Sequence, residues 1–151
     1  MIDDESISKN VHRVSLETLV LSLHVVANLF WVGSIVAVGS ILSAPTPALE
    51  VRGQLARRVY LRVAAPAFAV SFGSALVRLA LSPSYYLVAT HFMHAKLPLA
   101  LGVIALHHLL GARARRAERG ETTSLRPVPL MTALLAVLAA GSAWLALSKP
   151  F

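Results

Sequence analysis

Four long apolar runs, separated by short polar stretches, dominate the sequence. They predict helices over residues 15–42, 59–81, 86–110 and 129–147. A helix needs about 20 mainly apolar residues to cross the hydrocarbon layer of a bilayer, and each run is about that long. None of the runs carries the polar stripe that a helix of a soluble four-helix bundle presents to water. The pattern therefore predicts an all-α protein, a single integral membrane domain of four transmembrane helices over residues 1–151.

The composition agrees with this prediction and excludes several types of functional site. Of the 151 residues, 56% are hydrophobic and 14% are charged, whereas about a quarter of the residues of soluble domains are charged. The sequence contains no cysteine, which excludes disulfides, zinc–thiolate sites, iron–sulfur clusters and cysteine nucleophiles. It also lacks the glycine-rich phosphate loops, the serine-hydrolase elbow and the zinc-protease helix motif.

The net charge of +7 is concentrated between the apolar runs. This distribution is typical of loops that face the cytoplasm and anionic lipid, and it argues against a nucleic-acid partner. The acidic first residues do not resemble a removable signal peptide. The positive-inside rule predicts that loops 43–58 and 111–128 are cytoplasmic and that both termini lie on the other side. Lys9, Arg13 and Lys149 flank the spans on the other face, whereas nine arginines lie in or beside these loops: Arg52, Arg57, Arg58, Arg62, Arg113, Arg115, Arg116, Arg119 and Arg126.

Ionisable side chains inside the apolar runs are the candidates for chemistry, because a charge in hydrocarbon is costly. His24 is the ionisable residue of the apolar stretch 19–42, whereas His91, His94 and Lys96 lie in the outer half of the third run. At 1.5 Å per residue, His24 lies about 13 Å and Lys96 about 16 Å from the same membrane face. Arg78 lies near the outer end of the second run. We therefore predict a cofactor held between the first and third helices in their outer halves.

Each candidate also has a purely structural interpretation. His24 is either a cofactor ligand or catalytic group, or a core histidine that bonds to a serine or a carbonyl. Lys96 has no Asp or Glu to pair with in the apolar stretches 19–42, 59–81, 86–110 and 129–147, which favours a functional role. Arg78 either takes part in the site or extends to the interface. His107 and His108 lie near the cytoplasmic end of their helix, where we expect interfacial solvation.

Several of these residues lie in segments that resemble one family of membrane enzymes. The resemblance covers residues 23–108 and is to the HemJ-type bacterial protoporphyrinogen IX oxidases, whose general form the CopD-like membrane proteins share. The matching segments are Leu23-His24 with Trp31 and Gly33, Ala56-Arg57-Arg58-Val59-Tyr60 with Ala65-Pro66 and Gly73, and Phe92-Met93-His94-Ala95-Lys96-Leu97 with His107-His108.

The resemblance implies a protein of the bacterial inner membrane that binds haem b and oxidises protoporphyrinogen IX to protoporphyrin IX. It implies that His24 and Lys96 are the catalytic pair, and that His24 and His94 are candidate iron ligands. Lys96 would hold a porphyrin carboxylate or transfer a proton, and a quinone is a candidate electron acceptor. The predicted cofactor-binding set is His24, His94, Lys96, Trp31, Asn28 and Arg78, of which Asn28 and Trp31 lie on or beside the helical face of His24.

Two departures from the family pattern leave other functions open. Gly39 and Ser40 stand where the family has a Pro-Arg pair, and Phe92 replaces a signature tryptophan. If the missing arginine anchors a substrate carboxylate, the chain binds haem without oxidising protoporphyrinogen. The alternatives are a CopD-like copper-handling protein, for which the single Met93 beside His91 and His94 is a weak signal, a small cytochrome-like subunit of a larger complex, and a haem-free structural protein. A homo-oligomer is compatible with each of them.

Overall fold

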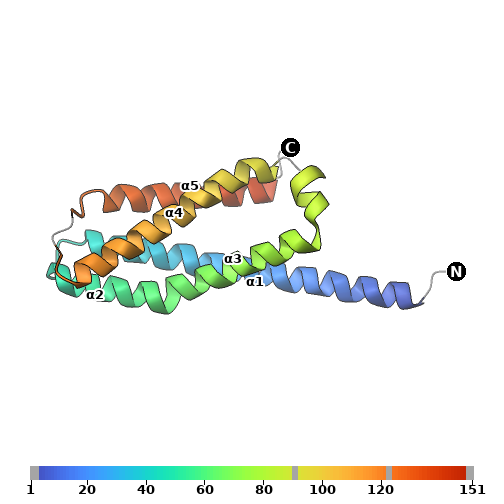
Figure 1. Ribbon diagram of the computed structural model, residues 1–151, viewed down its shortest axis with the longest axis horizontal. Helices are drawn as coiled ribbons and strands as arrows, with labels where there is room; N and C mark the ends of the chain where they lie inside the picture. Colours follow the sequence, from blue (N-terminus) through green and yellow to red (C-terminus); the bar gives the residue numbers. More distant parts are fainter. Residues whose placement is uncertain (1–3, 90–91, 122–123, 149–151) are drawn as a thin grey trace.

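The computed structural model describes residues 4–89, 92–121 and 124–148, and this part of the chain is helical, with no strand (Figure 1). His91 lies outside the described residues. The elements, in chain order, are α1 (Asp4–Ser43), α2 (Leu49–Val59), the π-helical turn η1 (Tyr60–Ala64), α3 (Ala65–Leu81), the π-helical turn η2 (Tyr85–Ala89), α4 (Phe92–Glu118) and α5 (Val128–Ser148).

Four helical segments are long and apolar enough to cross a membrane, which confirms the predicted all-α, four-span architecture. They are Ser15–Ser43, Leu49–Leu81, Phe92–Glu118 and Val128–Ser148. The second of these joins α2, η1 and α3 into one continuous helix. α1 begins and α5 ends at the same end of the bundle, and α1 extends beyond the other helices there (Figure 1). The membrane side that this end faces stays a prediction.

The second helix begins at Leu49, ten residues before the residue 59 that the apolar run predicts. The added segment α2 is polar on average, so hydropathy alone does not detect it. Its small residues Gly53 and Ala56 are buried. A Cβ atom at Gly53 would lie 2.2 Å from the backbone nitrogen of Glu118. α2 is therefore an amphipathic helix whose backbone packs directly against the end of α4.

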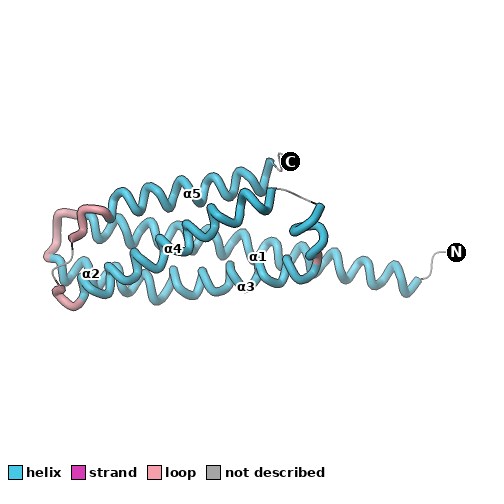
Figure 2. The backbone as a smooth tube through the Cα atoms, turned by 45° about the horizontal axis from the view of Figure 1, so that its top comes forward, coloured by secondary structure: helices cyan, strands magenta, loops and turns pink. Residues whose placement is uncertain are grey.

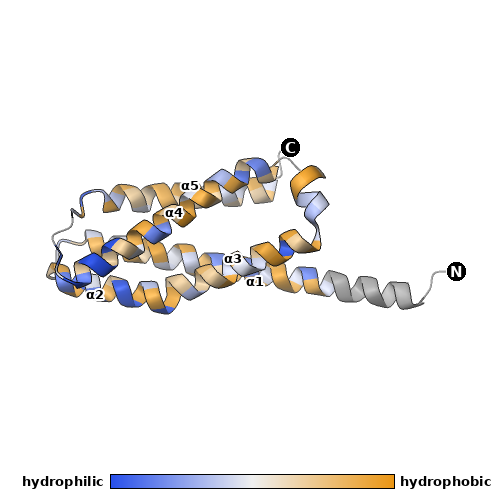
Figure 3. Ribbon diagram, in the orientation of Figure 1, coloured by the Kyte–Doolittle hydropathy of each residue, from blue (hydrophilic) through white to orange (hydrophobic). Residues whose placement is uncertain are grey.

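The third helix is also shifted relative to its prediction, since α4 begins at Phe92 rather than at 86 and ends at Glu118 rather than at 110. The extension carries arginines on one side but buries Ala114 and Ala117 on the other. The polar stretch between the last two helices is thus shorter than the 111–128 segment that the sequence predicts. Figure 3 shows the resulting band of hydrophilic residues around α2 and the carboxyl end of α4.

The four spans form two pairs that come together at one end. α1 packs along α3 and α4 packs along α5, whereas α3 and α4 hardly meet. Figures 1 and 2 both show α4 close to α2 at the loop end and beside α5, away from α3, at its amino end. We call the half of the bundle next to α2 the loop half, and the half that contains the amino end of α4 the outer half.

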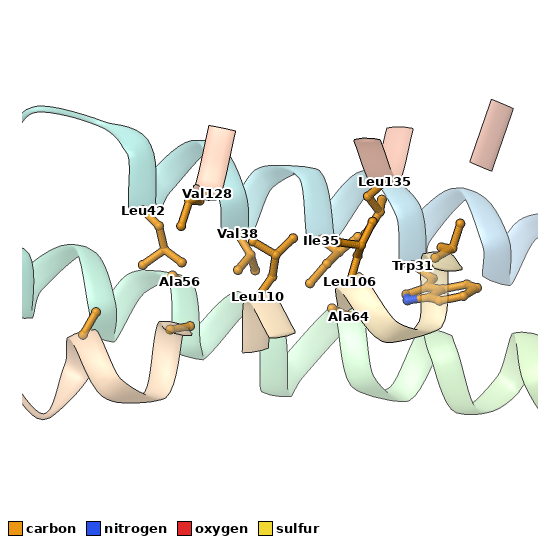
Figure 4. Close-up of a cluster of buried hydrophobic side chains, with 13 residues drawn as sticks. Trp31, Ile35, Val38, Leu42, Ala56, Ala64, Leu106, Leu110, Val128 and Leu135 are labelled. Carbon is orange, nitrogen blue, oxygen red and sulfur yellow. The ribbon is translucent and has the colours of Figure 1, made fainter. Parts of the chain in front are cut away.

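The packed apolar core belongs to the loop half. Its fully buried large side chains come from α1, α4 and α5 and interdigitate over the small residues of α2 and η1 (Figure 4). By contrast, the amino-terminal part of α4 contributes no side chain to this fully buried set. The fully buried set of the loop half is Ile35, Val38, Leu42, Leu110, Val128 and Leu135.

Candidate functional site

His24 lies between α1 and α3 and is held on its Nδ1 side by two serines of α3. Nδ1 lies 2.9 Å from the Ser71 carbonyl oxygen and 3.1 Å from Ser74 Oγ. The Ser74 hydroxyl donates to the same Ser71 carbonyl at 2.9 Å. A carbonyl oxygen only accepts, so the neutral ring carries its proton on Nδ1 and donates it to Ser71.

The other ring nitrogen of His24 faces Asn28, one helical turn further along α1. Asn28 Nδ2 lies 3.0 Å from His24 Nε2 and 2.8 Å from the His24 carbonyl oxygen. An amide nitrogen donates, so Nε2 offers its lone pair to Asn28, in agreement with the Nδ1–H tautomer. Serine, carbonyl and amide together hold one ring orientation. The predicted proximity of His24 and Asn28 on one helix face is confirmed by these two hydrogen bonds.

Lys96 and Arg78 bring positive charge to the same region from α4 and α3. Both charges lie within electrostatic range of His24, and the Arg78 charge also reaches Lys96. The ion pairs found among the described residues join Arg57 to Glu118 and Arg119 to Glu121 at the loop end. Within that part of the chain, no hydrogen-bond acceptor is found at Lys96 Nζ. The outer half thus gathers an imidazole and two cations from three helices.

The candidate site does not include every residue predicted for it. His94 is exposed, and its Nε2 lies 3.3 Å from the Leu87 carbonyl oxygen of η2. No described contact joins His94 to His24. Trp31 is buried on α1 but donates its indole N–H to His107 instead of reaching the His24 ring. Among the described residues, no three His, Asp or Glu side chains come together as a metal-binding group.

His107 is fully buried, so the expectation that it is solvated at the interface is wrong. Its Nδ1 accepts the Trp31 indole N–H at 3.1 Å, and its Nε2 lies 3.2 Å from the Tyr60 hydroxyl. Because Trp31 only donates, the neutral His107 ring carries its proton on Nε2 and donates it to Tyr60. The ring also stacks on Tyr60 and Phe68, with centroids 4.9 and 5.0 Å away. His108 next to it is exposed, as expected.

Local backbone features bring Tyr60 to His107. Tyr60 opens the π-helical turn η1, and such turns insert one extra residue into a helix. Gly111 of α4 faces the Tyr60 ring, where a Cβ atom would lie 2.3 Å from two ring carbons. The glycine therefore leaves the space that the phenol ring occupies. The Trp31–His107–Tyr60 network joins α1, η1 and α4 at the boundary between the two halves of the bundle.

The fold and this site define a multi-pass membrane protein with a polar centre between α1, α3 and α4. No protein-family model matches the chain, and no curated protein or solved structure is significantly similar to it. The chemical character of the centre follows from its donors alone. It offers one neutral imidazole whose tautomer is fixed and an ammonium group that can take an anionic partner.

Proposed function

We propose that this protein binds haem b in the outer half of the bundle and acts as a membrane oxidoreductase that resembles protoporphyrinogen IX oxidases. The observation that carries this proposal is the arrangement of His24 with Lys96. A fixed imidazole on α1 lies within electrostatic range of an ammonium on α4. An iron porphyrin needs a nitrogen ligand for its metal and is held by cations at its carboxylates; His24 would supply the ligand and Lys96 would supply one such cation.

The hydrogen bonds of His24 fit the role of a residue that would hold the haem iron. Histidines that bind metals commonly donate their other ring N–H to a carbonyl, which fixes the tautomer and the ring orientation. His24 donates from Nδ1 to the Ser71 carbonyl. The lone pair on Nε2 is directed at Asn28. Rotation of the Asn28 side chain would free that lone pair for an iron atom.

Lys96 fits the role of a group that binds a porphyrin carboxylate. It lies on the amino-terminal part of α4, where α4 has separated from α3. A lysine in a membrane span is costly without an anionic partner. Haem would supply one-electron redox chemistry at this place, and the protein would orient the substrate and exchange protons with it.

The remaining parts of the proposal rest on the sequence. The positive-inside rule supports an orientation with the loop half on the cytoplasmic side, and the family resemblance implies the bacterial inner membrane. A quinone dissolved in the bilayer is a suitable electron acceptor, because it can approach a site between membrane helices. His94 remains a candidate for the second iron ligand, by movement of its end of α4. The proposal does not depend on a homo-oligomer.

An absorption spectrum of the detergent-purified protein tests haem binding directly. We expect a Soret band that is lost in His24→Ala and kept in His108→Ala, a matched control that removes an exposed histidine from α4. A preparation without a Soret band, even after incubation with haemin, would overturn the proposal. Retention of the band in both variants would remove His24 as the ligand.

Lys96 variants separate carboxylate binding from proton transfer. The assay is oxidation of protoporphyrinogen IX by membranes from a host that lacks its own oxidase. If Lys96 binds a carboxylate, Lys96→Ala raises KM by roughly tenfold or more, the cost of a lost charged hydrogen bond, and Lys96→Arg restores most of the binding. If Lys96 transfers a proton, Lys96→Arg stays inactive because a guanidinium does not give up its proton. Full activity of Lys96→Ala would contradict both roles.

A haem-binding protein without oxidase activity is the second candidate, and one observation favours it. At the position of the family's Pro-Arg pair, Gly39 is buried against α5, where a Cβ atom would lie 1.9 Å from Thr132 Oγ1. The next residue, Ser40, is exposed and its hydroxyl donates to the Val36 carbonyl of its own helix. No arginine is available there to hold a substrate carboxylate. A Soret band without turnover of protoporphyrinogen IX would select this candidate.

A further inference from the structure

A small open pocket lies between the amino-terminal part of α1 and the end of α3, separate from His24. Its volume is about 210 Å³, which corresponds to about seven water molecules at roughly 30 Å³ each. Pockets for cofactor-sized ligands are larger, about 300–1,000 Å³. The pocket is therefore too small for a porphyrin and is suited to a compact polar group.

Side chains of opposite charge face this pocket from two helices. Glu17 and Thr18 come from α1, whereas Arg78, Ser82 and Tyr86 come from the end of α3 and the turn after it. The guanidinium of Arg78 donates to the Tyr86 hydroxyl at 2.6 Å and lies over the Tyr86 ring, 5.5 Å from its centroid. Tyr86 thus holds the Arg78 side chain in place at the pocket. An occupant of this pocket meets a fixed cation and a carboxylate at the same time.

The position of the pocket along the helices corresponds to the headgroup layer of a membrane. Glu17 is the third residue of the candidate span Ser15–Ser43, and Leu81 is the last residue of Leu49–Leu81. Leu21 and Leu81 form the apolar part of the pocket wall. The perpendicular pair Tyr85–Tyr86 lies beside it, and tyrosines are enriched at membrane–water interfaces. An occupant can therefore place a polar end in the pocket and an apolar end in the bilayer.

We propose that this pocket binds the headgroup of a phospholipid that carries a primary amine, a phosphoethanolamine. The phosphate accepts hydrogen bonds from Arg78 and from the pocket hydroxyls, and the ammonium donates to Glu17. A neutral glycerol headgroup offers Glu17 hydroxyl groups instead of a cation, so it lacks the stronger charge-assisted bond that an ammonium makes. A trimethylammonium has no N–H with which to reach the carboxylate, so hydrogen bonding selects the primary amine. Arg78 then binds the lipid phosphate in this pocket, and Lys96 binds a carboxylate in the proposed porphyrin site.

Native mass spectrometry of the full-length protein in detergent tests the proposal. The protein is titrated with phosphatidylethanolamine, phosphatidylcholine and phosphatidylglycerol of identical acyl chains, and also with inorganic phosphate. We expect phosphatidylethanolamine to bind about tenfold more tightly than phosphatidylcholine, the value of roughly one charged hydrogen bond. Binding of inorganic phosphate that equals that of the lipid would assign the pocket to a free anion and overturn the proposal.

Three variants identify the groups responsible. Glu17→Gln should remove the preference for phosphatidylethanolamine over phosphatidylglycerol, and Arg78→Gln should weaken binding of both lipids about tenfold or more. Arg126→Gln, an exposed arginine at the other end of the molecule, is the matched control and should bind as the wild type does. Circular dichroism confirms that each variant is folded. A preference that survives in both Glu17→Gln and Arg78→Gln would overturn the proposal, whatever the haem content of the protein.

Discussion

The two halves of this bundle use polar residues in opposite ways. In the loop half, His107 is fully buried and both of its ring nitrogens engage aromatic side chains within a packed apolar core. In the outer half, His24 is held by serines and an amide, next to exposed leucines and a lysine. The first arrangement leaves no atom for a ligand, whereas the second needs only one side chain to rotate. The two histidines therefore differ in whether the rotation of one side chain can free a ring nitrogen.

The largest expected effect is on the packing of the loop half. Gly53→Ala places a methyl group within 2.2 Å of the α4 backbone, which cannot move as a flexible side chain can. We expect a loss of about 2–3 kcal/mol in the free energy of unfolding, as for an overpacked core. Thermal unfolding in detergent, followed by circular dichroism, measures it.

Gly33 of the same chain provides the control for this substitution. A Cβ atom at Gly33 meets nothing within 4 Å, so Gly33→Ala should be neutral or should stabilise the helix by up to about 1 kcal/mol. Equal losses for the two variants would mean that the loop half is no more tightly packed than the rest of the bundle.

A smaller effect is expected at the boundary between the halves. His107→Leu leaves the buried Trp31 indole N–H without its acceptor, which costs about 1–3 kcal/mol. The near-ultraviolet circular dichroism of Trp31 should change as well. His108→Leu, which replaces an exposed neighbour, should stay within about 0.5 kcal/mol of the wild type. A free energy of unfolding that is unchanged in His107→Leu would contradict the buried hydrogen-bond network.

In the outer half, the expected effect on stability is small and the effect on ligand binding is larger. Asn28→Ala removes the amide that occupies His24 Nε2. We expect haem to bind about two- to tenfold more tightly, because one hydrogen bond no longer competes with the iron. Titration of the haem-free protein with haemin, followed at the Soret band, gives the affinity. Weaker binding would indicate that Asn28 contacts the bound haem instead.

The smallest effect is expected at Ser74. Ser74→Ala removes one of two acceptors near His24 Nδ1, but the Ser71 carbonyl remains at 2.9 Å. The free energy of unfolding should fall by no more than about 1 kcal/mol, and ¹⁵N NMR of labelled histidine should still report the Nδ1–H tautomer. A change of tautomer would show that the hydroxyl, and not the carbonyl, fixes the ring.

The four spans could be predicted from the sequence because hydropathy accumulates over about 20 residues and tolerates single polar ones. The helical segments at 49–58 and 111–118 could not, since their stabilisation comes from small residues packed against another helix. The small residues that make these contacts are Gly53 and Ala56 of α2 and Ala114 of α4. The sequence alone does not show which helix they pack against. The arginines of these segments lower the local hydropathy, so that hydropathy predicts loops there.

The candidate site was predictable to the extent that it depends on helical periodicity. The i, i+4 spacing places Asn28 next to His24, as the hydrogen bonds confirm. The serines that hold His24 come from α3, 47 and 50 residues later, and no local pattern reveals them. The burial of His107 had one signal in the sequence, since it lies eleven residues, about three turns, after Lys96 on the same helical face. At His107, this face of α4 points into the core of the bundle.

The π-helical turn Tyr60–Ala64 has a consequence for both halves at once. Each added residue rotates the rest of the helix around its axis by about 100°. The extra residue thus sets the rotation about the helix axis between the two polar faces of this continuous helix. At its first residue, Tyr60 points at His107; after the turn, Ser71 and Ser74 point at His24. Excising one residue from the turn would restore a regular helix and leave only one of the two histidines with its partners.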